Sequence, residues 1–215
     1  MNTQSTSTPP APPVIPAVAA AGQTSPLAPE QMRAVALAHR QAAKLRSATK
    51  IALMNGILLA VFSGLSLLFV LAEAAFGEFD GVGVVMGVGL GALAWNELRG
   101  RALLKRFNPR APSVLGWNQV MLLGLIVAYA VWTMAAALLG PNPYDEVMRR
   151  APQAARLLGD IGRFYRMMSV ALYGGLIVGT LIFQGLNARY YFTRARLLGD
   201  YLAQTPPWIL DLQRL

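Results

Sequence analysis

The chain contains no cysteine and only one histidine, and both shortages narrow its chemistry. Without cysteine it can form no disulfide, no thiolate metal site and no cysteine nucleophile. The histidine, His39, lies in a basic segment, where a solvated side chain is the ordinary interpretation. A Ser-His-Asp triad cannot be assembled around it from the residues present. We therefore expect a protein that is not an enzyme and that binds no cofactor and no metal.

Charged residues are also scarce. They make up 13% of the chain, whereas a typical soluble domain has roughly 25%. Hydrophobic residues make up 55% and are gathered into long runs, which is a membrane composition. No charged residue lies in the middle of any of these runs. That pattern argues against a proton relay or an ion pathway built on carboxylates, because such sites place charged groups inside the membrane.

Four apolar runs organise the chain, at about residues 51–75, 81–98, 114–140 and 167–186. A helix needs roughly 20 mostly apolar residues to cross a bilayer. The second run reaches that length only if Trp95 and Asn96 lie at the interface and Arg99 extends its charge into water. The sequence predicts an all-α fold: a four-transmembrane-helix up-down bundle with cytoplasmic and interfacial helix extensions, forming one membrane domain over residues 30–215.

Three segments outside the runs have their own character. Residues 1–29 carry no charge and are rich in Pro, Ala, Ser and Thr, which predicts disorder. Within residues 141–166 we expect a short helix on the outer surface and then a helix leading into the fourth run. After Pro206 and Pro207 the tail carries an apolar patch, Trp208, Ile209 and Leu212. This patch folds back on the bundle, enters the membrane interface or docks to a partner.

The basic residues predict an orientation. Fourteen of the 19 Lys and Arg residues flank one side of the runs and five, within 149–166, flank the other. By the positive-inside rule both termini are cytoplasmic, and the composition suits a bacterial inner membrane. The net charge of +9 indicates anionic lipids as partners rather than nucleic acid. The residues expected to contact those lipids are Arg99, Arg101, Lys105, Arg106, Arg194 and Arg196.

Two smaller expectations concern the edges of the spans. Glu97 and Arg101 stand four residues apart just past the second run, which is the favourable order for an exposed ion pair on a helix. Tyr190, Tyr191 and Phe192 are expected to form an aromatic belt at the membrane interface.

Five glycines fall within residues 81–91, GVGVVMGVGLG. A dinucleotide-binding loop needs G-x-G-x-x-G between a strand and a helix. Gly81, Gly83 and Gly87 are spaced one residue too far, and a polar turn rather than a strand precedes them. Spacing and context therefore exclude a phosphate loop and favour a helix face built for close packing.

Small residues recur at intervals of four in three of the runs, which lets helix backbones approach one another. The residues expected to pack are Gly56, Ala60 and Gly64 in the first run, Gly83, Gly87 and Gly91 in the second, and Gly175 and Gly179 in the fourth. Whether these stripes meet within one chain or between chains is left open by the sequence.

Amide side chains occupy the cytoplasmic third of the spans: Asn55, Asn96, Asn118, Gln119, Gln184 and Asn187. An amide in this layer costs free energy unless it finds a hydrogen-bond partner, so these side chains should face inward. One interpretation is a polar clamp that fixes the register of the helices. The other is a small site for a polar ligand or a lipid headgroup.

Three stretches, WNELRGRALLKRFNPRAP (95–112), LGWNQ (115–119) and ARYYFTRARLLGDYLAQTPPWILDLQRL (188–215), resemble a group of short, uncharacterised bacterial integral membrane proteins. The resemblance implies the membrane class and brings no activity or site residue with it.

Taken together, these patterns predict an assembly or accessory subunit that packs with itself, as a homo-oligomer, or with partner membrane proteins. The alternative is a small transporter, or a membrane protein that binds a lipid or polar ligand at the amide layer. A soluble chain after cell lysis without detergent would contradict both.

Overall fold

The protein is built from α-helices. The computed structural model describes residues 28–141, 144, 150 and 161–214, and these ranges contain no strand. Four helices are long and apolar enough to cross a membrane: α1 (Pro29–Ala75), α2 (Gly81–Lys105), α3 (Ala111–Leu139) and α6 (Ile161–Gln204). A short helix, α7 (Pro207–Arg214), follows. The expectation of an all-helical chain with four helices able to span a membrane is confirmed.

The extensions expected beyond the spans are continuous with them. The basic segment before the first apolar run and the run itself form a single helix of 47 residues, α1. Helix α6 likewise continues past the fourth run and has 44 residues. The expected disorder of residues 1–29 falls on positions outside the described residues except for Ala28 and Pro29, which begin α1. The expected outer helix, within 141–160, also lies almost wholly outside them.

A tight turn joins α1 to α2. Gly77 has a φ of 83°, a left-handed conformation that ends a helix at little cost because glycine has no Cβ. The amide of Glu78 then donates to the carbonyl of Glu73, which satisfies a free carbonyl of the last turn. Asp80 caps the next helix, since its Oδ1 accepts a hydrogen bond from the amide of Val82 at 3.0 Å. These contacts return the chain so that α2 packs along α1.

In the turn between α2 and α3 the residue with a left-handed backbone is Phe107, whereas in the first turn it is a glycine. Phe107 has a φ of 53°, which is strained for a residue with a Cβ. Its buried ring lies 5.4 Å from the ring of Tyr201, centroid to centroid. We infer that this packing holds the strained turn in place.

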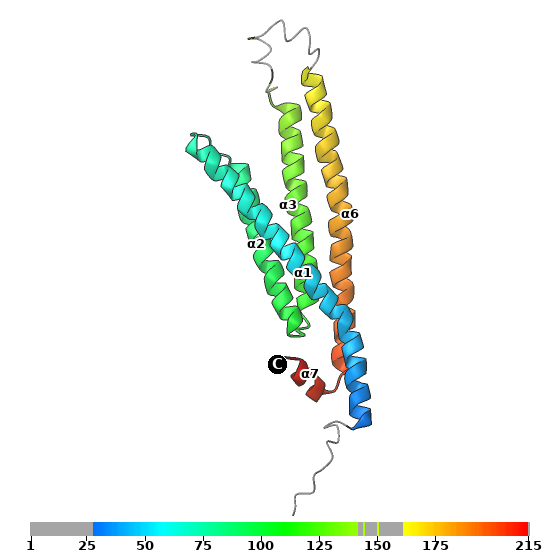
Figure 1. Cartoon of the computed structure of the whole chain (residues 1–215). Helices are drawn as coiled ribbons and strands as arrows, with labels where there is room; N and C mark the ends of the chain where they lie inside the picture. The colour runs from blue at the N-terminus through cyan, green and yellow to red at the C-terminus, as the bar shows by residue number, and fades with distance from the viewer. Residues whose placement is uncertain (1–27, 142–143, 145–149, 151–160, 215) are drawn as a thin grey trace, which may run out of the picture.

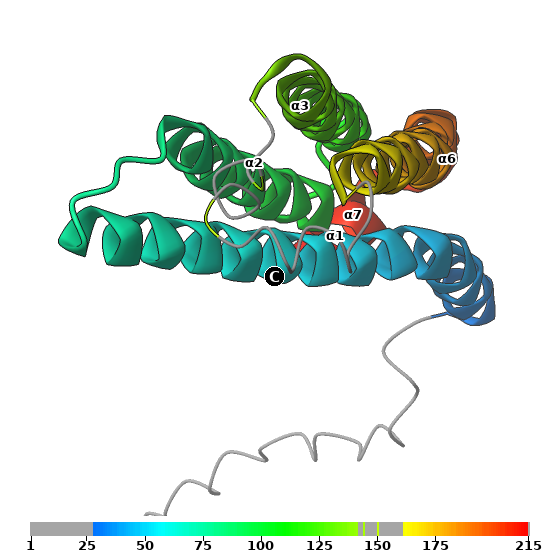
Figure 2. The same cartoon turned by 90° about the horizontal axis from the view of Figure 1, so that it is seen from above.

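The helices form two pairs, α1 with α2 and α3 with α6, and α2 joins the pairs by packing on α3 (Figures 1 and 2). The pairs close at one end and separate toward the other (Figure 1). At the closed end, all four long helices and α7 contribute to one core. Its largest fully buried apolar side chains are Leu104, Leu115, Tyr191, Leu198 and Ile209. A smaller core, Leu59, Leu93, Ala94 and Leu122, joins the pairs further along.

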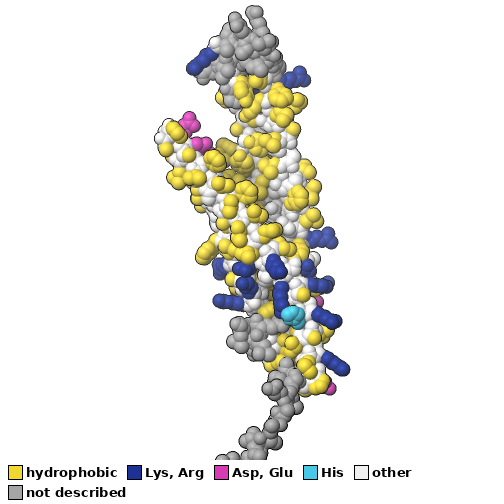
Figure 3. Space-filling model, in the orientation of Figure 1, with side chains coloured by type: hydrophobic (Ala, Val, Ile, Leu, Met, Phe, Trp, Pro, Cys, Tyr) yellow, Lys and Arg dark blue, Asp and Glu magenta, His cyan; other side chains and the backbone are white. Residues whose placement is uncertain are grey.

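Charge follows the same axis. On the face shown in Figure 3, most Lys and Arg side chains gather around the closed end, further basic side chains lie at the far end of the α3–α6 pair, and acidic side chains mark the tip of the α1–α2 pair. Hydrophobic side chains cover the surface between them. We call the closed end the basic end and the tip of the α1–α2 pair the acidic end. The apolar belt between them has the arrangement expected of a protein that crosses a bilayer.

Candidate functional site

A carboxyl group is buried where α2, α3 and α6 meet. Glu97 on α2 has no exposed surface. Its Oε2 accepts a hydrogen bond of 2.6 Å from Nδ2 of Asn118, and Nε2 of Gln119 lies 3.1 and 3.2 Å from its two oxygens. The hydroxyl of Tyr191 on α6 donates to Oε1 at 3.0 Å. One side chain therefore links three helices through hydrogen bonds.

This arrangement corrects two interpretations of the sequence. Glu97 was expected to form an exposed pair with Arg101, but among the described residues no ion pair joins the two, and the carboxyl instead meets amides and a phenol. Tyr191 was expected in an interfacial belt and is fully buried. In both cases the hydrogen bond between α2 and α6, across 94 residues of sequence, decides the position.

A helical pattern could have revealed the site. Tyr191 lies seven residues after Gln184 and four after Asn187, so all three share one face of α6. Glu97 lies seven residues after Leu90, which faces the inside of the molecule from α2. Because Glu97 and Tyr191 share helix faces with the amide layer, they are better interpreted as members of that layer.

The six amides predicted from the sequence divide between the hydrogen-bond network around this carboxyl and the cavity beside it. Nδ2 of Asn96 donates to Oδ1 of Asn118 at 2.9 Å, and Nδ2 of Asn118 also reaches the carbonyl of Leu93 at 3.1 Å. Asn55 lies beside the carboxyl of Glu97. The amides that line the neighbouring cavity are Asn55, Gln119, Gln184 and Asn187.

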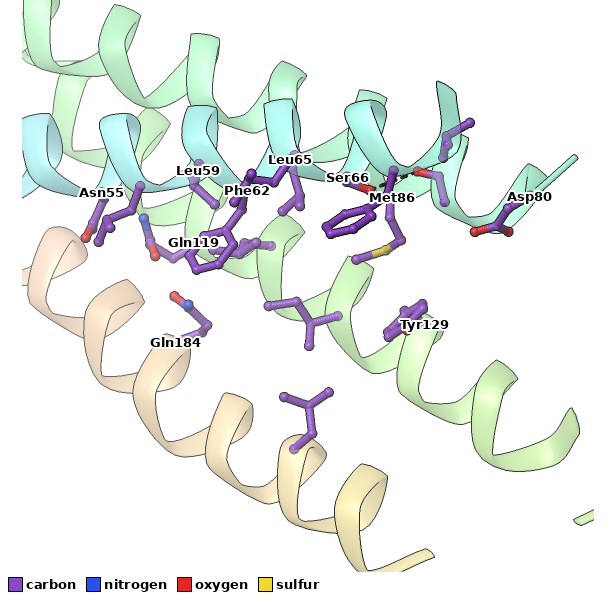
Figure 4. Close-up of a pocket in the computed structure, with 18 of the residues that line it drawn as sticks. Asn55, Leu59, Phe62, Leu65, Ser66, Asp80, Met86, Gln119, Tyr129 and Gln184 are labelled. Atoms are coloured by element: carbon purple, nitrogen blue, oxygen red, sulfur yellow. Dashed lines mark hydrogen bonds between the residues drawn. The ribbon is translucent and has the colours of Figure 1, made fainter. Parts of the chain in front are cut away.

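That cavity is a groove of about 820 Å³ between the two helix pairs. Figure 4 shows Asn55, Gln119 and Gln184 at one end of it, from α1, α3 and α6, and Asp80 at the other. Glu73 also lines it, while its middle is apolar, with Phe62 among the side chains that project into it. The groove thus has an amide end, an apolar middle and an acidic end.

Two amide atoms at the polar end lack partners. Nδ2 of Asn55 and Oε1 of Gln184 are buried and make no hydrogen bond within the part of the chain that the structure describes. A buried donor or acceptor without a partner is costly. The amide layer therefore has two regions. Asn96, Asn118 and Gln119 are bonded into the network around Glu97, whereas Asn55 and Gln184 line the groove and each keeps one buried amide atom without a hydrogen-bond partner among the described residues.

The glycines of α2 pack against side chains of α1 in the same chain. A Cβ built on Gly87 would lie 2.6 Å from Cδ2 of Leu67 on α1, and one on Gly91 would lie 2.9 Å from Oγ of Ser63. Ser63 in turn donates to the carbonyl of Gly87 at 2.7 Å. Gly56 meets Leu98 in the same way, and Gly83 meets Val70. Close approach of α1 and α2 thus requires small residues at these positions.

The other small residues meet nothing comparable. A Cβ on Gly64, Gly175 or Gly179 would have no heavy atom within 4 Å among the described residues. Ala60 is exposed. The small-residue stripe of α6 is therefore open to whatever surrounds this chain, as is the outer part of the stripe on α1.

The six basic residues expected to contact lipid divide into two groups. Four are exposed: Arg99, Lys105, Arg106 and Arg196. Arg101 and Arg194 are half-buried, and Nε of each is buried without a hydrogen-bond partner among the described residues. The guanidinium of Arg194 lies 4.4 Å from the centre of the Tyr190 ring, a cation–π distance. These two arginines are turned toward the interior rather than freely solvated.

Comparisons with protein-family models, curated proteins and solved structures find no match for this chain. Among the described residues, no group of three or more His, Cys, Asp or Glu side chains is placed to hold a metal ion. The candidate site is therefore defined by its own geometry: a buried carboxyl joint with an amide-ended groove beside it.

Proposed function

We propose that the protein is a non-enzymatic multi-pass membrane protein that assembles with copies of itself or with partner membrane proteins. A bacterial inner membrane with both termini in the cytoplasm suits the basic end, which would face the cytoplasm. Consecutive long helices alternate in direction in Figure 1, which supports an up-down bundle.

One observation carries the proposal. The glycine stripe of α2 is filled by α1, whereas Gly175 and Gly179 on α6 meet nothing within 4 Å. Within a bilayer no hydrophobic driving force joins helices, so association depends on close packing at small residues. The stripe on α6 offers that packing to another helix, and no described helix of this chain uses it.

The test compares isoleucine at two positions. Gly179→Ile should convert the oligomer or complex into single chains in native mass spectrometry, and the single chains should keep the helix content of the unsubstituted protein in circular dichroism. Gly87→Ile should instead reduce the stability of the chain by about 1–3 kcal/mol, because the added side chain overpacks the contact with Leu67. The melting temperature in detergent reports this loss.

Gly185→Ile is the matched control for α6. Gly185 is also open, and it lies six residues from Gly179 and so on a different side of the helix. Unchanged assembly in Gly179→Ile, or equal disruption by Gly185→Ile, would contradict assembly through the stripe.

A second candidate function is binding of a lipid or polar ligand, as in a carrier or small transporter. The groove of about 820 Å³ favours it, since single-molecule sites have volumes of roughly 300–1,000 Å³ and combine apolar walls with a few polar groups. The two functions are compatible, because the groove and the stripe on α6 involve different residues.

A further inference from the structure

The length of the groove fits the apolar depth of a membrane. Asn55 and Glu73 line its two ends from the same helix, α1. Glu73 follows Asn55 by 18 residues, which corresponds to about 27 Å at the helical rise. The hydrocarbon core of a bilayer is about 30 Å thick. The groove therefore runs along the whole apolar region, with polar groups at both ends.

The middle of the groove is open to the side. Phe62 and Phe69 line it and are 58% and 69% exposed, and Leu65 is 46% exposed. In a bilayer this opening would face acyl chains. A hydrocarbon chain lying in the groove would cover these side chains without crossing a polar barrier.

The amide end needs an occupant with its own hydrogen-bonding groups. Asn55 and Gln184 line this end, and one buried amide atom of each makes no hydrogen bond among the described residues. A second helix would offer no acceptor from its backbone, because the backbone groups of a membrane helix are already bonded to one another. A lipid glycerol region supplies ester carbonyls, which accept hydrogen bonds from the N–H groups of side-chain amides.

Charge distinguishes the two ends. Arg101 lies one helical turn beyond Glu97, and Arg194 lies seven residues beyond Asn187 on the same face of α6. Each holds a buried Nε without a partner among the described residues. Glu73 and Asp80 stand at the opposite end of the groove. Arg163 and Arg166 of α6 also lie toward that end of the molecule, so the contrast between the two ends rests on Glu73 and Asp80, which line the groove there. Inside the groove an anionic headgroup is therefore disfavoured beside these carboxylates relative to the basic end.

We propose that the groove binds one anionic glycerophospholipid from the leaflet at the basic end. Its phosphate faces Arg101 and Arg194, its ester carbonyls lie at the amide end, and an acyl chain lies along Phe62. This inference rests on the proposed membrane placement and gives the ligand class for the second candidate function. It does not depend on assembly through α6.

The experiment uses the full chain reconstituted in vesicles of phosphatidylglycerol or of phosphatidylcholine. The protein is extracted in mild detergent, and native mass spectrometry counts the phospholipids retained on each chain. We expect about one phosphatidylglycerol per chain, with phosphatidylcholine retained much less. Ile126→Trp should abolish the retention, because Ile126 lines the groove and the larger ring fills it. Val131→Trp is the matched control, since Val131 is exposed and lies elsewhere on α3.

The contribution of the basic side chains to lipid retention is tested separately. Arg194→Gln should weaken phosphatidylglycerol retention about fivefold, as expected for the loss of one basic residue near an anionic headgroup. Arg166→Gln, at an exposed position toward the opposite end of α6, makes the same change of charge and should leave it unchanged.

Three outcomes would overturn the inference: equal retention of the two lipids, equal retention in Ile126→Trp and Val131→Trp, or cross-linking of a polypeptide into the groove. The same spectra report the number of chains in each particle. Lipid retained on a single chain would contradict the proposed assembly but not the groove site. An oligomer without lipid would contradict the groove site but not the assembly.

Discussion

Replacement of Glu97 by alanine is expected to reduce the free energy of unfolding by about 3–5 kcal/mol. The substitution removes the acceptor for Asn118, Gln119 and Tyr191 at once. Each buried donor left without a partner costs about 1–3 kcal/mol, and cross-helix hydrogen bonds in membranes fall toward the lower limit. Thermal unfolding in detergent, followed by circular dichroism, measures the loss.

Glu78→Ala is the control, because it makes the same change at an exposed glutamate in the α1–α2 turn. It should alter stability by less than about 0.5 kcal/mol. Tyr191→Phe measures the contribution of a single hydrogen bond to this carboxyl. It removes one donor to the same carboxyl and should cost about 1 kcal/mol. If Glu97→Ala and Glu78→Ala melt alike, the carboxyl joint does not hold the helices together.

The helices themselves could be predicted from the sequence because their signals are local. Long apolar runs separated by charged segments indicate membrane-spanning helices, and a run of small residues at intervals of four indicates a packing face. The partner of that face is not local. Gly87 meets Leu67 and Gly91 meets Ser63 because the short turn at Gly77 folds α2 back along α1.

The candidate site was predictable only in part, for the same reason. Amides in an apolar layer require partners wherever the chain goes, so Asn118 and Gln119 could be recognised from their type and depth. For Glu97 the sequence offers one partner nearby and one far away along the chain. Arg101 is one turn away on the same helix, while Tyr191 is 94 residues distant. The local pair suggested a solvated side chain, and only the packing of α3 on α2 and of α6 on α3, with Tyr191 of α6 reaching the carboxyl, shows that Glu97 is enclosed.

The groove could not be predicted from the sequence, because it depends on how the two helix pairs diverge. Its lining comes from all four long helices. The individual residues that line it, such as Phe62 or Leu65, look like any other apolar positions in a span. The two unpartnered amide atoms identify its polar end, and these appear only once the hydrogen bonds of the neighbouring amides are placed.

The C-terminal helix allows a second large effect to be predicted. The sequence left three positions open for the apolar tail, and the structure places Ile209 of α7 in the core at the basic end, with 1% of its surface exposed. Leu198 and Tyr201 on α6 belong to the same core. The tail therefore folds back on the bundle.

Ile209→Ala should cost about 2–5 kcal/mol, because it removes buried methyl groups and leaves a cavity among side chains that the long helices hold in place. The loss has an upper limit set by the docking of α7, since the helix can detach before the bundle unfolds. Hydrogen exchange separates the two events. Amides of residues 207–214 should lose protection in the variant, while those of α2 and α3 keep theirs.

Ile182→Ala is the matched control, since Ile182 on α6 is 54% exposed and should tolerate the same truncation. Equal protection of α7 in the two variants would mean that Ile209 does not anchor the tail. The basic end would then be held by the long helices alone, and the strained turn at Phe107 would depend on its contact with Tyr201 without support from α7.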